Sequence, residues 1–224
     1  SQTKPDHRIS LSDWQFMLRN ADNHTLPSPI TDTAITSDDI AAIIYTSGTT
    51  GSPKGAAITH GNFLHAITAY QQTLNLTSKD STILPIPICH ITGLSALLCL
   101  FIHIGGTIHL HQRFNADEIL KAISQYEITF LHGSPTVFIL LTQEAEKHLT
   151  EYHYSSLRMI ACGAGHLNIG IINKLSELFP NTEIRPIYGL TETTSPASIF
   201  PLDARESNKV GSSGLPIAGL ECQI

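Results

Sequence analysis

Short apolar runs alternate with amphipathic patterns along the chain from residue 39 onward. The runs that predict strands are residues 40–45, 81–86, 107–111, 128–131, 157–162 and 183–188. Between them, apolar residues at helical spacing predict helices over residues 59–76, 91–104, 115–126, 135–147 and 171–179. Strands that alternate with such helices are typical of an α/β fold, with a parallel or mixed sheet flanked by helices. Ligands of such sheets bind beyond the carboxyl ends of the strands.

Two of the predicted strands have unusual features. Residues 40–45 form an apolar run without a polar break and predict a buried strand. Residues 183–188 include Pro186, which weakens the prediction of a strand there because proline cannot donate to a sheet ladder. Each of these runs leads directly into a loop of unusual composition, which makes the two loops the first candidates for a binding site.

The predicted α/β core covers residues 39–209. A polar and irregular lead-in, with Pro27 and Pro29 in a predicted surface loop, precedes it over residues 1–38. Residues 210–224 resemble the start of a following β subdomain that the chain does not complete. We therefore expect one core with a partial element on either side.

Composition excludes several classes of protein. Of the 224 residues, 42% are hydrophobic and 14% are charged, as in ordinary globular proteins. The net charge is −6 and no basic stripe is present, so a nucleic-acid partner is not expected. The most apolar segment, residues 91–104, is shorter than the about 20 residues of a membrane span. No CxxC pair occurs among the cysteines, which we expect to be reduced core residues of a cytoplasmic protein: Cys89, Cys99, Cys162 and Cys222.

The loop over residues 45–55 reads Y-T-S-G-T-T-G-S-P-K-G. Its glycines allow sharp bends that expose backbone amides, its hydroxyl groups add donors, and Lys54 adds a positive charge. These groups together suit a polyphosphate. A flexible surface turn is the alternative, and the apolar run that feeds the loop argues against it. The candidate phosphate-contacting residues are Thr46, Ser47, Gly48, Thr49, Thr50, Gly51 and Lys54.

A Walker A loop would have a serine or threonine directly after its lysine, to hold magnesium. In this chain Gly55 follows Lys54. The sequence therefore excludes a P-loop NTPase.

The same loop resembles the phosphate-binding signature of the adenylate-forming superfamily, which includes acyl-CoA synthetases, firefly-type luciferases and peptide-synthetase adenylation domains. A second signature of that superfamily, Y-G-L-T-E-T, stands at residues 188–193 and is preceded by G-A-G at residues 163–165. Weaker similarities occur at residues 87–93 and 210–216. The resemblance extends over nearly all of the chain from about residue 36.

The resemblance implies ATP and Mg²⁺ as ligands. Lys54 and the hydroxyl groups of the first loop would bind the β- and γ-phosphates, Tyr188 would stack on adenine, and Glu192 would hold magnesium. A solvated glutamate at a helix start is the alternative for Glu192. The other residues that the resemblance places on the nucleotide are Gly163, Ala164, Gly165, Gly189 and, at the α-phosphate, Thr191.

Elementary chemistry agrees with these roles. A substrate carboxylate, with a pKa near ~4, is ionised at neutral pH and needs no general base. The reaction must instead bring two anions together, so positioning and charge neutralisation carry the rate.

His90 separates the subfamilies. Amino-acid-activating domains have an aspartate near this position that pairs with the substrate ammonium, whereas this chain has no acidic residue between positions 81 and 113. An unpaired ammonium would be costly to bury. His90 therefore resembles the histidine that flanks the acyl carboxylate in acyl- and aryl-CoA ligases, and a satisfied core histidine is the alternative.

The resemblance also implies an acyl pocket and a CoA contact. The pocket residues are His90, Thr92, Gly93, Ala96, Ser134 and Ile187. Arg113 occupies a position where some of these ligases have a basic residue that contacts a CoA phosphate, and an ordinary surface arginine is equally compatible with the sequence.

The expected function is ATP-dependent activation of a carboxylic acid to acyl-AMP, followed by transfer to CoA, by a catalytic set of Lys54, His90, Thr191 and Glu192. The alternatives are a fatty-acyl-AMP ligase or an aryl-acid adenylation domain that loads a carrier-protein pantetheine. A non-catalytic nucleotide-binding or scaffolding module is the alternative from another class. Members of the superfamily are longer and end in a small lid domain with a catalytic lysine, so we expect the chain alone to be inactive.

Overall fold

The computed structural model describes residues 34–47, 51–147, 151–209 and 211–223. The chain divides into two compact units, Ser1–Ile35 and Thr36–Ile224, and all elements below belong to the second. Most of the predicted lead-in therefore lies outside the described residues.

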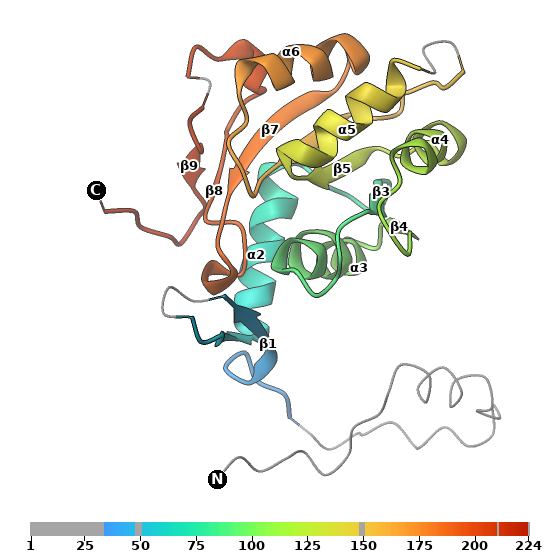
Figure 1. The fold of residues 1–224 in the computed structure, drawn as a ribbon. Helices are drawn as coiled ribbons and strands as arrows, with labels where there is room; N and C mark the ends of the chain where they lie inside the picture. Colours follow the sequence, from blue (N-terminus) through green and yellow to red (C-terminus); the bar gives the residue numbers. More distant parts are fainter. Residues whose placement is uncertain (1–33, 48–50, 148–150, 210, 224) are drawn as a thin grey trace, which may run out of the picture. The chain divides into compact units, whose positions relative to one another are not determined.

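A seven-stranded mixed sheet forms the centre of the second unit (Figure 1). In spatial order the strands are β4 (Thr107–Leu110), β3 (Ser81–Leu84), β5 (Phe130–Gly133), β6 (Met159–Cys162), β7 (Glu183–Tyr188), β8 (Ser198–Ile199) and β9 (Leu215–Pro216). The first five strands in this order run parallel, and β8 and β9 continue the sheet in antiparallel pairing beside β7. The predicted fold class is confirmed.

Helices pack on both faces of this sheet. One apolar core joins the sheet to α4 (Ala116–Tyr126), α5 (Pro135–Ala145) and α6 (Ile169–Leu178). A second core, on the other face, joins it to α2 (His60–Thr73), η1 (Thr92–Cys99) and α3 (Leu100–Ile104). Short 3-10 turns, η2 (Thr191–Thr193) and η3 (Ala204–Glu206), complete the elements. None of the helices in the described ranges has both the length and the hydrophobicity that crossing a membrane requires.

Side-chain caps define where the helices begin. Thr59 and Asn62 form a reciprocal capping box at the start of α2. Asn115, Ser134 and Asn168 each accept a backbone N–H from the residue three positions later, at the starts of α4, α5 and α6. These polar residues before apolar periodic segments explain why the predicted helix starts agree with the structure.

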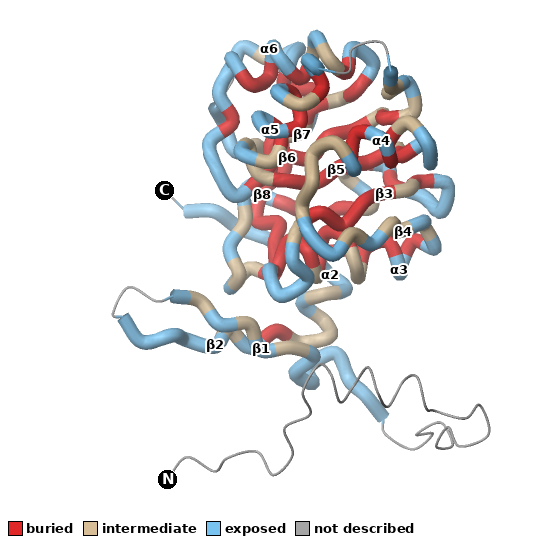
Figure 2. Tube along the Cα trace, turned by 45° about the vertical axis from the view of Figure 1, so that its right-hand side comes forward, coloured by how far each residue is buried: buried red, intermediate tan, exposed pale blue. Residues whose placement is uncertain are grey.

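The first predicted strand differs from expectation. β1 (Ile40–Thr46) pairs with β2 (Lys54–Thr59) in a separate antiparallel hairpin and does not join the main sheet. The prediction of a buried strand is wrong: Ile40, Ile43 and Tyr45 are 60%, 57% and 71% exposed, and Figure 2 shows exposed and intermediate stretches alternating along the hairpin. Ile58 packs one face of the hairpin into the molecule, whereas no described element covers the other face. An apolar run indicates that burial would be favourable, but it does not indicate that another segment packs against it.

The last predicted strand agrees with the structure in spite of its proline. Pro186 lies beside Cys162 of β6, and its carbonyl accepts the backbone N–H of Phe200.

The cysteine prediction is correct only in part. All four are free, but Cys89 and Cys222 are exposed and only Cys162 is fully buried.

Candidate active site

The carboxyl ends of β3, β5, β6 and β7 meet at one edge of the sheet, and a cavity of about 250 Å³ opens there. Thr46, at the end of β1, lines it together with Thr191 and Glu192 from the loop after β7. The structure therefore brings the two predicted phosphate-contacting segments to one cavity. The predicted site residues that line it are Thr46, His90, Thr92, Gly163, Ala164, Ile187, Gly189, Thr191 and Glu192.

A second cavity, of about 430 Å³, lies between the 163–165 loop and the end of β7. Ala164, Gly165, Tyr188 and Gly189 line it, joined by residues 211–213 from the weaker motif near the C-terminus. A Cβ at Gly163 would approach the carbonyl oxygen of Ile187 to 3.0 Å. Gly163 thus permits close packing of this loop against the end of β7, where Tyr188 is half-exposed.

A third cavity, of about 340 Å³, adjoins the first and shares His90, Thr92 and Gly163 with it. Its wall is largely apolar, with Ser134 among the few polar residues. Ser134 is also the N-cap of α5, where its hydroxyl accepts the Val137 N–H at 3.4 Å. This cavity matches the predicted acyl pocket in position.

Three predicted pocket residues do not line this cavity. Ile187 lines the first and second cavities instead. Ala96 is fully buried in the core between the sheet and η1, and Gly93 lines none of the three cavities. A Cβ at Gly93 would lie 2.4 Å from the carbonyl oxygen of Pro87, so this glycine allows η1 to pack against the segment after β3. Their small size serves helix packing rather than the width of a pocket.

His90 is exposed at the cavity wall and is not a core histidine. The backbone N–H of Thr92 donates to its Nδ1 at 3.2 Å. In the neutral imidazole the proton therefore resides on Nε2, which becomes the hydrogen-bond donor. That donor suits a carboxylate oxygen.

His132 was not predicted, although it lines both the first and the third cavity. It is only 3% exposed, and its Nε2 lies 3.2 Å from the hydroxyl of Tyr70. Burial, with a smaller contribution from the nearby His90, lowers the pKa of His132 to about 3, so the ring is neutral at physiological pH. Its place directly after the predicted strand 128–131 was the only sequence signal.

The first loop is described only at its two ends. Gly48, Thr49 and Thr50 lie outside the described residues. Ser47 is exposed, Gly51 has a left-handed φ of 82°, and Lys54 begins β2 directly opposite Thr46 in the hairpin. The prediction that this loop binds phosphates therefore depends on Thr46 and Lys54 at its base.

Arg113 lies apart from the three cavities described above. It lines a mainly apolar groove of about 580 Å³ that shares Pro85, Pro87 and Phe114 with the predicted acyl pocket. A route from the acyl pocket toward Arg113 therefore exists along the surface.

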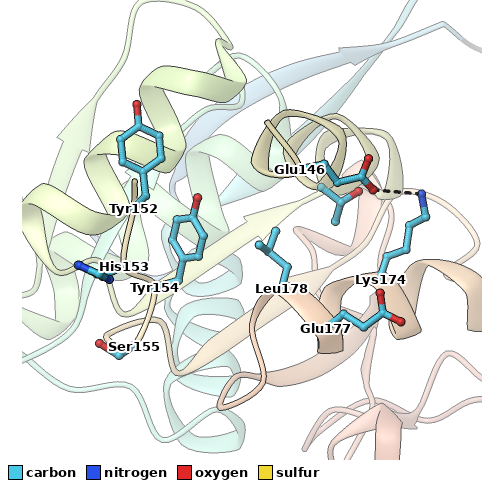
Figure 3. A pocket seen from close by; sticks show the side chains of 9 residues that line it. Glu146, Tyr152, His153, Tyr154, Ser155, Lys174, Glu177 and Leu178 are labelled. Carbon is cyan, nitrogen blue, oxygen red and sulfur yellow. Dashed lines mark ion pairs between the residues drawn. The ribbon is translucent and has the colours of Figure 1, made fainter. Parts of the chain in front are cut away.

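The molecule has another cavity, of about 470 Å³, where the segment that leads into β6 meets α5 and α6 (Figure 3). Tyr152 and Tyr154 line it on one side, and Lys174 with Glu146, 3.8 Å apart, on the other. No predicted site residue lines it. Size alone therefore does not identify the active site.

In the described part of the chain, no group of three or more His, Cys, Asp and Glu side chains could hold a metal ion. Mg²⁺ is commonly held by one or two carboxylates together with substrate phosphates. A single exposed Glu192 beside Thr191, in the cavity that Thr46 also lines, fits that mode of binding.

CoA ligases are among the known proteins with similar sequences. The chain is 36% identical over 186 residues to 2-succinylbenzoate–CoA ligase of Bacillus pumilus, covering 82% of this chain and 36% of that protein. It is 32% identical over 191 residues to 4-coumarate–CoA ligase-like 2 of Arabidopsis thaliana, covering 85% and 33%. The chain thus spans about a third of the length of these relatives.

A solved structure has the same fold. O-succinylbenzoate coenzyme A synthetase from Bacillus subtilis, in complex with ATP and a magnesium ion, superposes with a TM-score of 0.72 at 32% identity, covering 82% of this chain and 37% of that one. In addition, the family model for AMP-binding enzymes matches residues 2–224. With both signatures at one edge of the sheet, the chain belongs to the AMP-binding enzyme family, the adenylate-forming superfamily.

Proposed function

We propose that the protein of which this chain forms part is an AMP-forming acid–thiol ligase. It activates a carboxylic acid with ATP to an acyl-AMP and transfers the acyl group to CoA. The observation that carries the proposal is the shared cavity of Thr46, Thr191 and Glu192, which adjoins an apolar pocket through His90 and Thr92. The names of the relatives support the CoA-dependent second step.

The residues of the chain have separate tasks in this reaction. Thr46, Thr191 and Lys54 contact phosphate oxygens, and Glu192 holds Mg²⁺, which neutralises phosphate charge when bound. His90 donates from Nε2 to the acid carboxylate and orients it toward the α-phosphate. No group has to remove a proton, because the acid is already ionised.

The CoA step uses the apolar groove beside the acyl pocket. Arg113 at its edge offers a positive charge to a CoA phosphate. The reaction takes place in the cytoplasm, where ATP and CoA are available, and it acts on small carboxylic acids or fatty acids.

Nucleotide binding by the chain itself tests the first half of the proposal. We expect MgATP to bind in isothermal titration calorimetry, and Lys54→Ala and Glu192→Ala each to weaken it by about 10-fold or more, because each removes a charge that the phosphates or Mg²⁺ need. Glu146→Ala and Lys174→Ala remove the same two kinds of charge at the other cavity and should leave binding unchanged. Equal binding by all variants would indicate a scaffold and not an enzyme.

Turnover by the full-length protein tests the second half. We expect carboxylate-dependent release of pyrophosphate, and release of AMP only when CoA is added. Release of AMP with a carrier-protein pantetheine but not with CoA would identify a carrier-loading adenylation domain instead.

A further inference from the structure

His132 occupies the wall between the two halves of the candidate active site. It lies in β5, one residue before the end of the strand, and lines both the cavity of Thr191 and Glu192 and the apolar cavity beside it. His132 is thus one of the residues that an acid extending between the two cavities can contact.

One nitrogen of the His132 ring has a partner and the other does not. Nε2 faces the Tyr70 hydroxyl at 3.2 Å, and that hydroxyl lies 3.2 Å from Ser195 Oγ. Nδ1 is buried and has no hydrogen-bond partner in the described part of the chain. Leaving a buried polar atom unpaired is unfavourable, so a group that pairs with Nδ1 on binding gains affinity.

The ring is held on several sides. The ring of Tyr70, which is fully buried, packs against it edge to face, with centroids 5.8 Å apart. Phe130 packs against it at 6.4 Å, and a Cβ at Gly163 would lie 3.6 Å from its Cε1. Nδ1 is therefore a fixed feature of the wall rather than a side chain free to find another partner.

The remainder of the apolar cavity offers few polar groups. Ser134 caps α5, and Nδ1 of His90 accepts the Thr92 N–H. Pro85, Phe114 and Val137 supply carbon surface. An oxygen atom on a bound acid would find its partner in His132, while the hydrocarbon part of the acid would contact the other walls.

We propose that His132 is a specificity-determining residue, whose Nδ1 hydrogen-bonds to a hydroxyl or carbonyl oxygen carried close to the carboxylate of the substrate. The inference rests on the proposed function and narrows it: the preferred acids are oxygen-substituted rather than plain hydrocarbon acids. The neutral ring of His132 can donate or accept at Nδ1, depending on its tautomer, and a hydroxyl group matches either state.

Matched pairs of acids test the preference. We suggest benzoate against 2-hydroxybenzoate, and butanoate against 2-hydroxybutanoate, with dissociation constants measured by ligand-observed NMR on the chain in the presence of MgATP. We expect the oxygen-substituted member to bind about 10-fold more tightly, the size of one good hydrogen bond in a buried site.

Two substitutions separate the two nitrogens. The amide of His132→Asn lies near the position of Nδ1, and that of His132→Gln lies near Nε2. We expect His132→Asn to keep the preference and His132→Gln to lose it, although His132→Gln retains a partner for Tyr70. Tyr70→Phe removes only the hydroxyl and should keep the preference. Thermal unfolding and MgATP affinity of each variant report whether the site remains folded.

The possible results distinguish this inference from the proposed function. If the wild type binds both members of each pair equally, or if His132→Gln keeps the preference, the inference is wrong while acid activation stands. If no acid binds although MgATP does, the proposed function fails and the inference with it.

Discussion

The polar side chains at the two ends of the parallel strands differ in whether they bond to one another or face a cavity. Asp80, Thr129 and Arg158 directly precede β3, β5 and β6. Arg158 donates to both carboxylate oxygens of Asp80 at 2.8 Å, and the hydroxyl of Thr129 donates to Oδ1 at 2.8 Å. At the opposite end of the sheet, His132 near the carboxyl end of β5 has an unpaired nitrogen, and Thr191 and Glu192 after β7 line a cavity.

The comparison indicates which end of the strands stabilises the fold and which end binds ligands. At the amino ends, the polar groups of three neighbouring strands bond to one another and tie the strands together. At the carboxyl ends, polar groups face cavities, where a ligand can complete their hydrogen bonds. Changes at the first end should therefore alter folding, and changes at the second should alter binding.

The largest effect is expected from Asp80→Ala. The side chain of Asp80 is 5% exposed, and its removal takes from Arg158 and Thr129 the carboxylate to which both donate. We expect a loss of about 3 kcal/mol in the free energy of unfolding, measured by urea denaturation at pH 7, with MgATP affinity unchanged under conditions where the variant is folded. Lys174→Ala, at an exposed ion pair, is the matched control and should change stability by less than about 0.5 kcal/mol.

The difference in the free energy of unfolding between wild type and Asp80→Ala should depend on pH. Burial alone would raise the pKa of Asp80, but hydrogen bonds from Arg158, Thr77 and Thr129 outweigh it and lower the pKa below the ordinary 3.8. The contribution of Asp80 is therefore complete above pH 3.8 and is lost as the pH falls through the lower, folded-state pKa. A gap between wild type and Asp80→Ala that stayed constant into strong acid would contradict this assignment.

A smaller effect is expected from His132→Leu. The pKa of His132 is about 3 in the folded chain against 6.5 for an exposed histidine, because burial and, secondarily, His90 disfavour its charge. Below pH 6.5, His132 becomes protonated in the unfolded state but stays neutral in the folded state. The free energy of unfolding therefore falls as the pH decreases toward 3. Between pH 7 and pH 5 the wild type should lose about 2 kcal/mol more than His132→Leu in denaturant titrations. Parallel pH profiles would refute a buried neutral His132.

The smallest effect is expected from Ala164→Gly. Ala164 has a φ of 57°, in the left-handed region that glycine adopts more readily. We expect the variant to gain about 1 kcal/mol in thermal unfolding experiments, which would show that the backbone conformation at Ala164, beside the second cavity, is strained. Ala116→Gly in the first turn of α4 is the control and should lose stability. A loss in both variants would mean that the backbone at Ala164 is unstrained.

The main architecture could be predicted from the sequence because its signals are local. The spacing of apolar residues distinguished strands from helices, and Thr59 and Asn115 marked helix starts through hydrogen bonds to their own backbone neighbours. Pro186 was compatible with β7 because its carbonyl still accepts a hydrogen bond. Each of these features is decided within a few residues of the chain.

What the sequence did not reveal depends on contacts between distant segments. Ile43 is exposed because none of the described elements packs on that face of the hairpin, which no local sequence pattern could indicate. The burial of Ala96 follows from the packing of η1 against the core that also contains residues of α2, α3 and the sheet. His132 gained its role only when folding placed Tyr70, far away in sequence, against one of its nitrogens.

The hydroxyl of Tyr70 touches the wall of the acyl cavity at His132 and the loop of Thr191 and Glu192 at Ser195. One atom on α2 thus contacts both the wall of the apolar cavity and the loop that carries Thr191 and Glu192. Any redesign of that wall has to preserve the Tyr70 hydroxyl if the loop is to keep its contact with α2.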